Sequence, residues 1–253
     1  MIRLLRRILA AGLIAGCVAG LAVTAVQQIQ VVPLILAAEL FESAAPAHHH
    51  DATPHEHAPG AAAHSHDSEA WAPQDGLERN LFTLLANIVA GVGYGAILVA
   101  LMVFAGRKLD WQRGLLWGLG GFAAFALAPA MGLPPELPGM AAADLAARQM
   151  WWIATAGATI AGLGLIVFAP ARHAALKIAV PLAGIALLAL PHLLGAPEHA
   201  AEAGNVPAEL AARFAVASLI AQAAFWAVLS AIAGHLLGRA LPQVAQPLPL
   251  AAA

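Results

Sequence analysis

The sequence predicts an all-α membrane protein with about six transmembrane helices. Of its 253 residues, 61% are hydrophobic and only 10% are Asp, Glu, Lys or Arg, whereas a soluble domain carries about 25% of these charged residues. The apolar residues gather in segments of about 20, the length of helix that crosses the hydrocarbon layer. No segment alternates apolar and polar residues as a strand of a membrane β-barrel does.

Six segments meet the length and hydropathy expected of a span. They are roughly residues 8–30, 81–104, 115–133, 150–169, 176–194 and 214–237. The chain then divides into an N-terminal transmembrane helix (1–40), a histidine-rich external loop (41–79), a five-helix transmembrane bundle (80–240) and a cytoplasmic tail (241–253).

The first segment has two interpretations. Apolar sequence continues past Gln30 to Leu40, which favours one long helix kinked at Pro33. Alternatively, three arginines followed by residues 8–26 resemble a cleaved signal peptide, and the residues before Cys17 resemble a loose lipoprotein cleavage box. The apolar run continues for nine residues past Cys17. This continuation favours a retained span.

The basic residues predict the orientation, because Lys and Arg favour cytoplasmic loops. With six spans and both termini cytoplasmic, nine basic residues lie inside: Arg3, Arg6, Arg7, Arg107, Lys108, Arg113, Arg172, Lys177 and Arg239. Only Arg79, Arg148 and Arg213 lie outside, together with thirteen of the fourteen acids. The external face is therefore acidic and suits a cation.

A weak three-fold pattern suggests three helical hairpins. Each even-numbered span begins with an acid four residues before an arginine, at Asp75 and Arg79, Asp144 and Arg148, and Glu209 and Arg213. Each odd-numbered span has an outer proline followed six or seven residues later by an acid, at Pro33 and Glu39, Pro129 and Glu136, and Pro191 and Glu198. The alternative is that helix ends attract these residue types in any protein.

Small residues predict close contacts between helices. Gly12, Gly16 and Gly20 form a ridge on the first span, and Gly114 and Gly118 form a shorter one on the third. Gly91, Gly93 and Gly95 lie in the second span. Such ridges let helices approach closely in lipid. The pattern fits both a tight bundle and an interface with a partner helix.

The strongest chemical signal is the loop between the first two spans. Seven of the eleven histidines occupy nineteen residues there, among three acids: His48, His49, His50, His55, His57, His64 and His66. Neutral imidazole binds Co²⁺, Ni²⁺, Zn²⁺ and copper, and carboxylates add charge. The loop therefore predicts metal collection; the alternative is a solvated linker.

Polar residues at or within the spans suggest a path for the ion, because burying them in lipid costs free energy. His192, near the outer end of the fifth span, and His199 in the following loop are candidate metal ligands. Candidates for lining the path are Gln27, Gln28, Glu39, Asn87 and Glu136. The alternatives are an interfacial histidine, amides that hold helices together and solvated carboxylates.

Several activities lack their sequence signals. No glycine-rich loop precedes a lysine, and there is no HExxH or GxSxG motif. We therefore expect no enzymatic activity and no permanently bound cofactor. The lone Cys17 excludes an internal disulfide and a cysteine-cluster metal site.

Several specific strings follow one another along nearly the whole chain. They are Arg6-Arg7, Gln27-Gln28, Val32-Pro33-Leu34, the histidine loop, Asp75-Gly76-Leu77-Glu78-Arg79, Leu84-Leu85-Ala86-Asn87, Leu133-Pro134-Pro135-Glu136-Leu137-Pro138-Gly139, Arg148-Gln149-Met150-Trp151-Trp152, Leu190-Pro191-His192-Leu193 and Val206-Pro207-Ala208-Glu209-Leu210. With these strings the chain resembles the CbtA-type subunits of a predicted cobalt transporter. The resemblance implies work with CbtB, a small single-span protein with its own histidine motif. Descriptions of the family often give five spans, where this sequence predicts six.

Together, the residues and the resemblance predict a multi-pass permease subunit of a bacterial inner membrane that takes up Co²⁺ as its substrate. Ni²⁺ and Zn²⁺ remain alternatives, because imidazole and carboxylate ligands serve several divalent ions. A second hypothesis is a non-transporting metal sensor or accessory scaffold for a partner transporter. Nucleic-acid binding is not expected, since the sequence has no basic patch to support it.

Overall fold

The computed structural model describes residues 2–43, 73–74, 76–168, 174–198 and 205–241. The elements are α1 (Ile2–Gln30), α2 (Val32–Ser43), α3 (Leu77–Phe104), α4 (Trp111–Phe122), the π-helix η1 (Ala123–Leu127), α5 (Ala128–Gly132), α6 (Leu145–Phe168), α7 (Ala174–Leu194) and α8 (Ala208–Ala240). No strand occurs among these residues. Six helical stretches, with α4, η1 and α5 joined as one, are long and apolar enough to cross a membrane. The predicted fold class is confirmed.

The first span is kinked near Pro33. The helix α1 ends at Gln30, and α2 begins at Val32. The N–H of Val31 still donates to the carbonyl of Gln27 at 2.9 Å. Pro33 has no N–H to donate to the carbonyl of Ile29, so the helical ladder is interrupted there.

The third span contains a π-helical turn that the sequence analysis did not predict. Within η1 the ladder widens, and the N–H of Ala128 donates to the carbonyl of Ala123, five residues earlier. Pro129 follows directly and cannot donate to the carbonyl of Phe125. The turn widens the helix close to its proline, and such π-bulges are frequent at functional sites.

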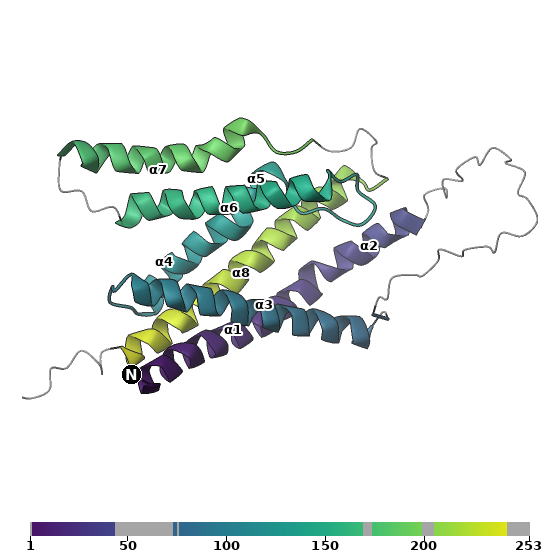
Figure 1. The fold of residues 1–253 in the computed structure, drawn as a ribbon. Coiled ribbons are helices and arrows are strands. Elements are labelled where there is room, and N and C mark those ends of the chain that lie inside the picture. Colours follow the sequence, from purple (N-terminus) through teal and green to yellow (C-terminus); the bar gives the residue numbers. More distant parts are fainter. Residues whose placement is uncertain (1, 44–72, 75, 169–173, 199–204, 242–253) are drawn as a thin grey trace, which may run out of the picture.

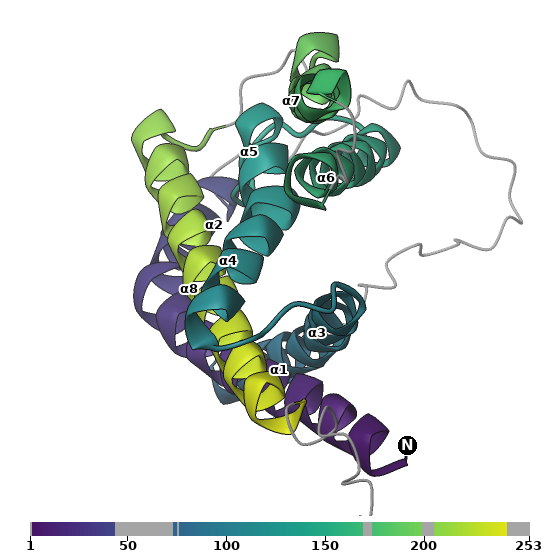
Figure 2. The same ribbon diagram turned by 90° about the vertical axis from the view of Figure 1, so that its left-hand side faces the viewer.

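Two groups of helices form the bundle (Figure 1). The helix α8 packs along both α1 and α4, and α1 also packs along α3. The helix α6 packs mainly on α7, which lies outermost, beyond α6 from α1 and α3 (Figure 2). Much of α7 is therefore left to face lipid or another protein.

Glycines hold the inner ends of α1 and α3 in backbone contact. We call this the inner seam: Gly12, Gly16 and Gly20 of α1 with Gly91 and Gly95 of α3. A Cβ atom added at Gly16 would lie 2.6 Å from the Cα of Val92, closer than real Cβ atoms come. A Cβ atom added at Gly118 of α4 would meet the carbonyl of Trp226 and the side chain of Ser230 on α8. These glycines therefore serve packing within the chain.

Two of the three expected hairpins are packed as pairs of spans. The first joins α1 and α3, and the second joins η1 and α5 to α6. In the third, α7 and α8 do not pack along each other within the part of the chain described. The N-terminus and the end of α8 lie at the same end of the molecule (Figure 1), as the predicted topology requires.

Candidate functional site

The predicted metal ligands divide into two groups. His48, His49, His50, His55, His57, His64, His66 and His199 lie outside the described residues. His192 lies in the last turn of α7. Among the described residues, no three His, Cys, Asp or Glu side chains are grouped so that they could hold a metal ion.

The predicted path amides lie between α1 and α3 and bond to each other. Asn87 donates to the side-chain oxygen of Gln27 at 2.7 Å and to the hydroxyl of Thr24 at 2.9 Å. Nearer the start of α3, Gln28 donates to Asn80 at 2.9 Å. We call these five residues the outer seam. Beyond the glycines, these side-chain hydrogen bonds continue the contact between α1 and α3.

The sequence analysis missed two members of the outer seam. Thr24 is a small residue in an apolar run, and its hydroxyl also donates to the carbonyl of Gly20 at 2.8 Å. That bond could equally belong to an isolated helix. Asn80 sits at the polar start of α3, where an exposed amide needs no explanation. Only the register of α1 against α3 shows that both residues face the other helix.

Two carboxylates at the end predicted to be external are held by arginines of the next span. Glu39 of α2 pairs with Arg79 of α3 at 2.7 Å, and both side chains are about one-third exposed. Glu136, between α5 and α6, pairs with Arg148 of α6 at 2.9 Å. The Glu136 side chain is only 8% exposed, against 36% for Arg148. Each arginine therefore offsets much of the negative charge expected at the external mouth.

Arg148 does not pair with the acid on its own helix, contrary to the expected spacing. Asp144 instead caps the start of α6, where its carboxylate accepts from the N–H of Ala147 at 2.9 Å. That bond satisfies an N–H that has no partner within the helix. The cap leaves the guanidinium of Arg148 to reach across to Glu136.

His192 lies half-buried beside aromatic and proline residues at the end predicted to be external. Its ring meets Trp151 of α6 edge-to-face, with centroids 5.8 Å apart. The Trp151 indole donates to the carbonyl of Pro129 at 3.4 Å, which links the third, fourth and fifth spans. Three residues after His192, Gly195 ends α7 with a φ of +89°, a conformation that glycine adopts readily. No hydrogen bond to the His192 ring is found within the described residues.

Deeper in the bundle, an aromatic cluster meets the π-helical turn. The ring of Tyr94 on α3 lies 5.2 Å from Phe125 of η1 and 5.3 Å from Trp226 of α8, edge-to-face in both contacts. Phe125 stacks on Trp226 with centroids 5.5 Å apart. The wider turn therefore places Phe125 where α3, the third span and α8 converge.

The outer seam, the two ion pairs and His192 all lie toward one end of the bundle, whose six apolar stretches are long enough to cross a membrane. A family model described as "Probable cobalt transporter subunit (CbtA)" matches residues 5–238. The chain belongs to the CbtA family. No curated protein and no solved structure gives a significant match. Membership of CbtA and the six apolar helices identify a multi-pass membrane protein of a transporter-subunit family.

Proposed function

We propose that this chain is the membrane permease subunit that admits Co²⁺ into a bacterial cell. The family match over residues 5–238 is the observation that carries the proposal. Within it, the external histidine loop collects the metal, and a small single-span CbtB-like subunit is the expected partner. The polar residues at the external ends of the spans support a cation path there.

The outer seam acts in this proposal as a closed gate. Asn87 donates to both Gln27 and Thr24, and these two bonds join α3 to α1. An arriving hydrated cation offers water and charge as replacement partners for the amide oxygens. Separating α1 from α3 at the outer seam costs little free energy, because each side-chain hydrogen bond between helices in a membrane contributes about 0.6 kcal/mol.

The ion pairs Glu39–Arg79 and Glu136–Arg148 affect which side chains an entering metal ion can bind. A cation that binds Glu136 or Glu39 must compete with Arg148 or Arg79 for the carboxylate. His192 does not face such competition, and a neutral imidazole remains a ligand for Co²⁺, Ni²⁺ and Zn²⁺. We therefore propose that His192 is the first residue of the bundle to bind the metal ion, and that the carboxylates of Glu39 and Glu136 attract the ion toward it.

The deciding experiment measures uptake of radiolabelled cobalt. Cells that lack other cobalt importers express the chain alone or with its small single-span partner. We expect saturable uptake above the vector control, and its loss in His192→Ala. The matched control is His235→Ala, because His235 is an exposed histidine in the C-terminal part of α8. Absence of uptake in both settings, with the protein found in the membrane, would favour a sensor or scaffold.

Replacement of the seven loop histidines by alanine tests the collecting role separately. We expect a higher apparent Km for cobalt and an unchanged maximal rate, because the loop raises the local metal concentration without forming the path. A lower maximal rate at saturating cobalt would show that the loop takes part in translocation. Competition by Ni²⁺ and Zn²⁺ in the same assay compares the candidate substrates.

A further inference from the structure

Thr155 of α6 differs from the other threonines that the structure describes. Thr24, Thr83 and Thr159 each donate their hydroxyl to the carbonyl four residues earlier on the same helix, at 2.8, 2.9 and 2.8 Å. The hydroxyl of Thr155 is fully buried, and no described residue forms a hydrogen bond with it. A buried polar group without a partner costs free energy. Such a group is expected where water or an ion binds.

Thr155 faces α7 between two points at which α6 and α7 touch. Toward the end predicted to be external, Trp151 meets the ring of His192, with centroids 5.8 Å apart. Toward the other end, a Cβ atom added at Gly162 would lie 2.7 Å from the carbonyl oxygen of Gly184. Positions 151, 155 and 162 share one face of an α-helix. Thr155 therefore lies on the contact with α7, one helical turn deeper than Trp151.

The helix α7 supplies a carbonyl in the same stretch of this contact. Pro191 is buried within α7 and has no N–H to donate to the carbonyl of Leu187. Leu187 lies between Gly184 and His192, the residues of α7 that meet α6 on either side of Thr155. A proline within a membrane helix is tolerated where other groups satisfy the carbonyl that it leaves. A hydroxyl and a carbonyl, each without its usual helical partner, thus lie in one part of the bundle.

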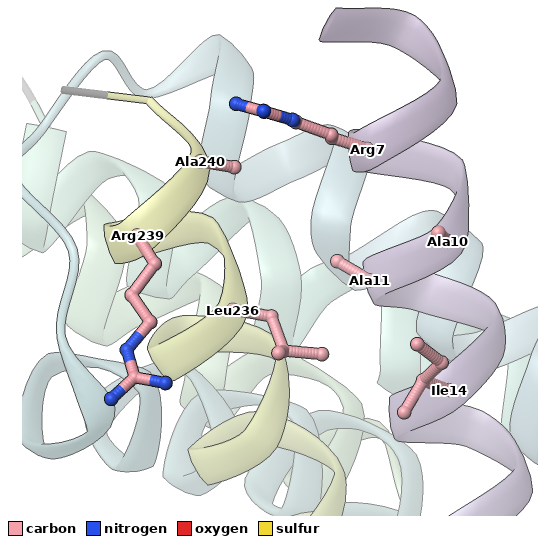
Figure 3. Close-up of a pocket in the computed structure, with 7 residues that line it drawn as sticks. All are labelled: Arg7, Ala10, Ala11, Ile14, Leu236, Arg239 and Ala240. Atoms are coloured by element: carbon pink, nitrogen blue, oxygen red, sulfur yellow. The ribbon is translucent and has the colours of Figure 1, made fainter. Parts of the chain in front are cut away.

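A groove between α1 and α8, where α1 begins and α8 ends, has a different chemistry. It is lined by Arg7, Arg239 and five apolar residues. The guanidinium of Arg239 points away from that of Arg7 (Figure 3). None of the described side chains that line this groove carries an oxygen atom to bind a cation. The contact between α6 and α7 therefore suits a cation better than this groove does.

We propose that Thr155 is the ligand that receives the cation from His192, together with the carbonyl of Leu187. This step rests on the proposed function, in which His192 is the first residue of the bundle to bind the metal. The hydroxyl and carbonyl oxygens each replace one water molecule of the ion's hydration shell. Neither group is charged, so the ion binds weakly enough to move on. Unlike the hydroxyl of Thr159, which is held by a hydrogen bond, the hydroxyl of Thr155 can turn its oxygen toward the ion.

The test compares cobalt uptake by Thr155→Val and the wild-type protein, each expressed with the small partner in cells that lack other cobalt importers. Valine keeps the branched shape of threonine and removes the hydroxyl. We expect the maximal rate to fall about tenfold at equal protein level, the effect of losing one polar contact to a charged group. Thr155→Ser keeps a hydroxyl and should restore most of the rate. Thr159→Val is the matched control, because the buried hydroxyl of Thr159 already bonds within α6, and it should keep the wild-type rate.

Thermal unfolding of the same proteins, purified in one detergent without metal, distinguishes a ligand from a packing residue. Thr155→Val should unfold at the wild-type temperature or a few degrees higher, because it removes a buried hydroxyl that has no partner among the described residues. A lower midpoint would show that the hydroxyl stabilises the fold, and would overturn the proposal. Wild-type uptake that Thr155→Val keeps, or that both valine variants lose equally, would also overturn it. Absence of uptake by the wild-type protein would refute the proposed function, and this step with it.

Discussion

The two halves of the contact between α1 and α3 are built in opposite ways. In the inner seam, the nearest atoms that each glycine faces on the other helix are backbone atoms. In the outer seam, Thr24, Gln27 and Gln28 bond to Asn80 and Asn87 through side chains. A glycine contact is lost if the helices separate, whereas an amide can exchange its partner for water or an ion. The inner seam is therefore suited to a fixed scaffold and the outer seam to a part that opens.

The largest expected effect comes from adding one methyl group to the inner seam. In Gly16→Ala the new Cβ meets the backbone of Gly91 and Val92, and overpacking of this kind should destabilise the protein by about 3 kcal/mol. Gly93→Ala is the control, because a Cβ there meets nothing within 4 Å. It should be neutral or stabilise by up to about 1 kcal/mol through helix propensity. Thermal unfolding of the purified proteins in one detergent compares the two, and equal midpoints would refute the tight contact.

A smaller loss of stability is expected when the more buried of the two ion pairs is broken. Arg148→Ala leaves the 8%-exposed carboxylate of Glu136 without its cation, which should cost about 2 kcal/mol. Adding Glu136→Gln should recover part of that loss, since the remaining side chain is neutral. Unfolding of the single and double variants measures the recovery. If Glu136→Gln lowers the stability of Arg148→Ala by as much as it lowers that of the wild-type protein, the two residues are not coupled.

The sequence predicts the six spans well, because the length of each apolar run and the cost of burying charge act locally. It also locates the glycine ridges, since a ridge is a property of one helix. It does not identify their partners: Gly16 meets Gly91 only in the register that the folded pair adopts.

The contacts of the candidate site are harder to predict from the sequence, because they too depend on how the helices pack. Arg79 and Arg148 lie four residues after an acid, but their bonds to Glu39 and Glu136 depend on how two spans are placed. The π-helical turn near Pro129 contacts α6 and α8, and no motif in the sequence marked it. The histidine loop has a clear composition and stays a prediction, as its residues lie outside those described.

Asn87 distinguishes a gate from a mere helix contact. Asn87→Ala removes two bonds of the outer seam and should destabilise the protein by about 1 kcal/mol. Gln28→Ala, which removes an exposed bond to Asn80, is the control and should cost less. If the seam is a gate, cobalt uptake by Asn87→Ala is kept or raised despite the lower stability. A fall in uptake at equal protein level would show instead that the Asn87 amide is itself needed along the path.

The smallest effect is expected at the more exposed ion pair of the same helix pair. Glu39 and Arg79 are each about one-third exposed, so their coupling should be only about 0.5 kcal/mol. A double-mutant cycle with Glu39→Gln and Arg79→Gln measures it at about 0.01 M salt, where the screening length is about 30 Å, and at about 1 M, where it is about 3 Å. We expect the coupling to vanish at high salt, because water and ions reach both groups. A coupling above about 2 kcal/mol that persists at high salt would mean that this end of α3 is as firmly fixed as the inner seam, and the contrast between the two halves would no longer hold.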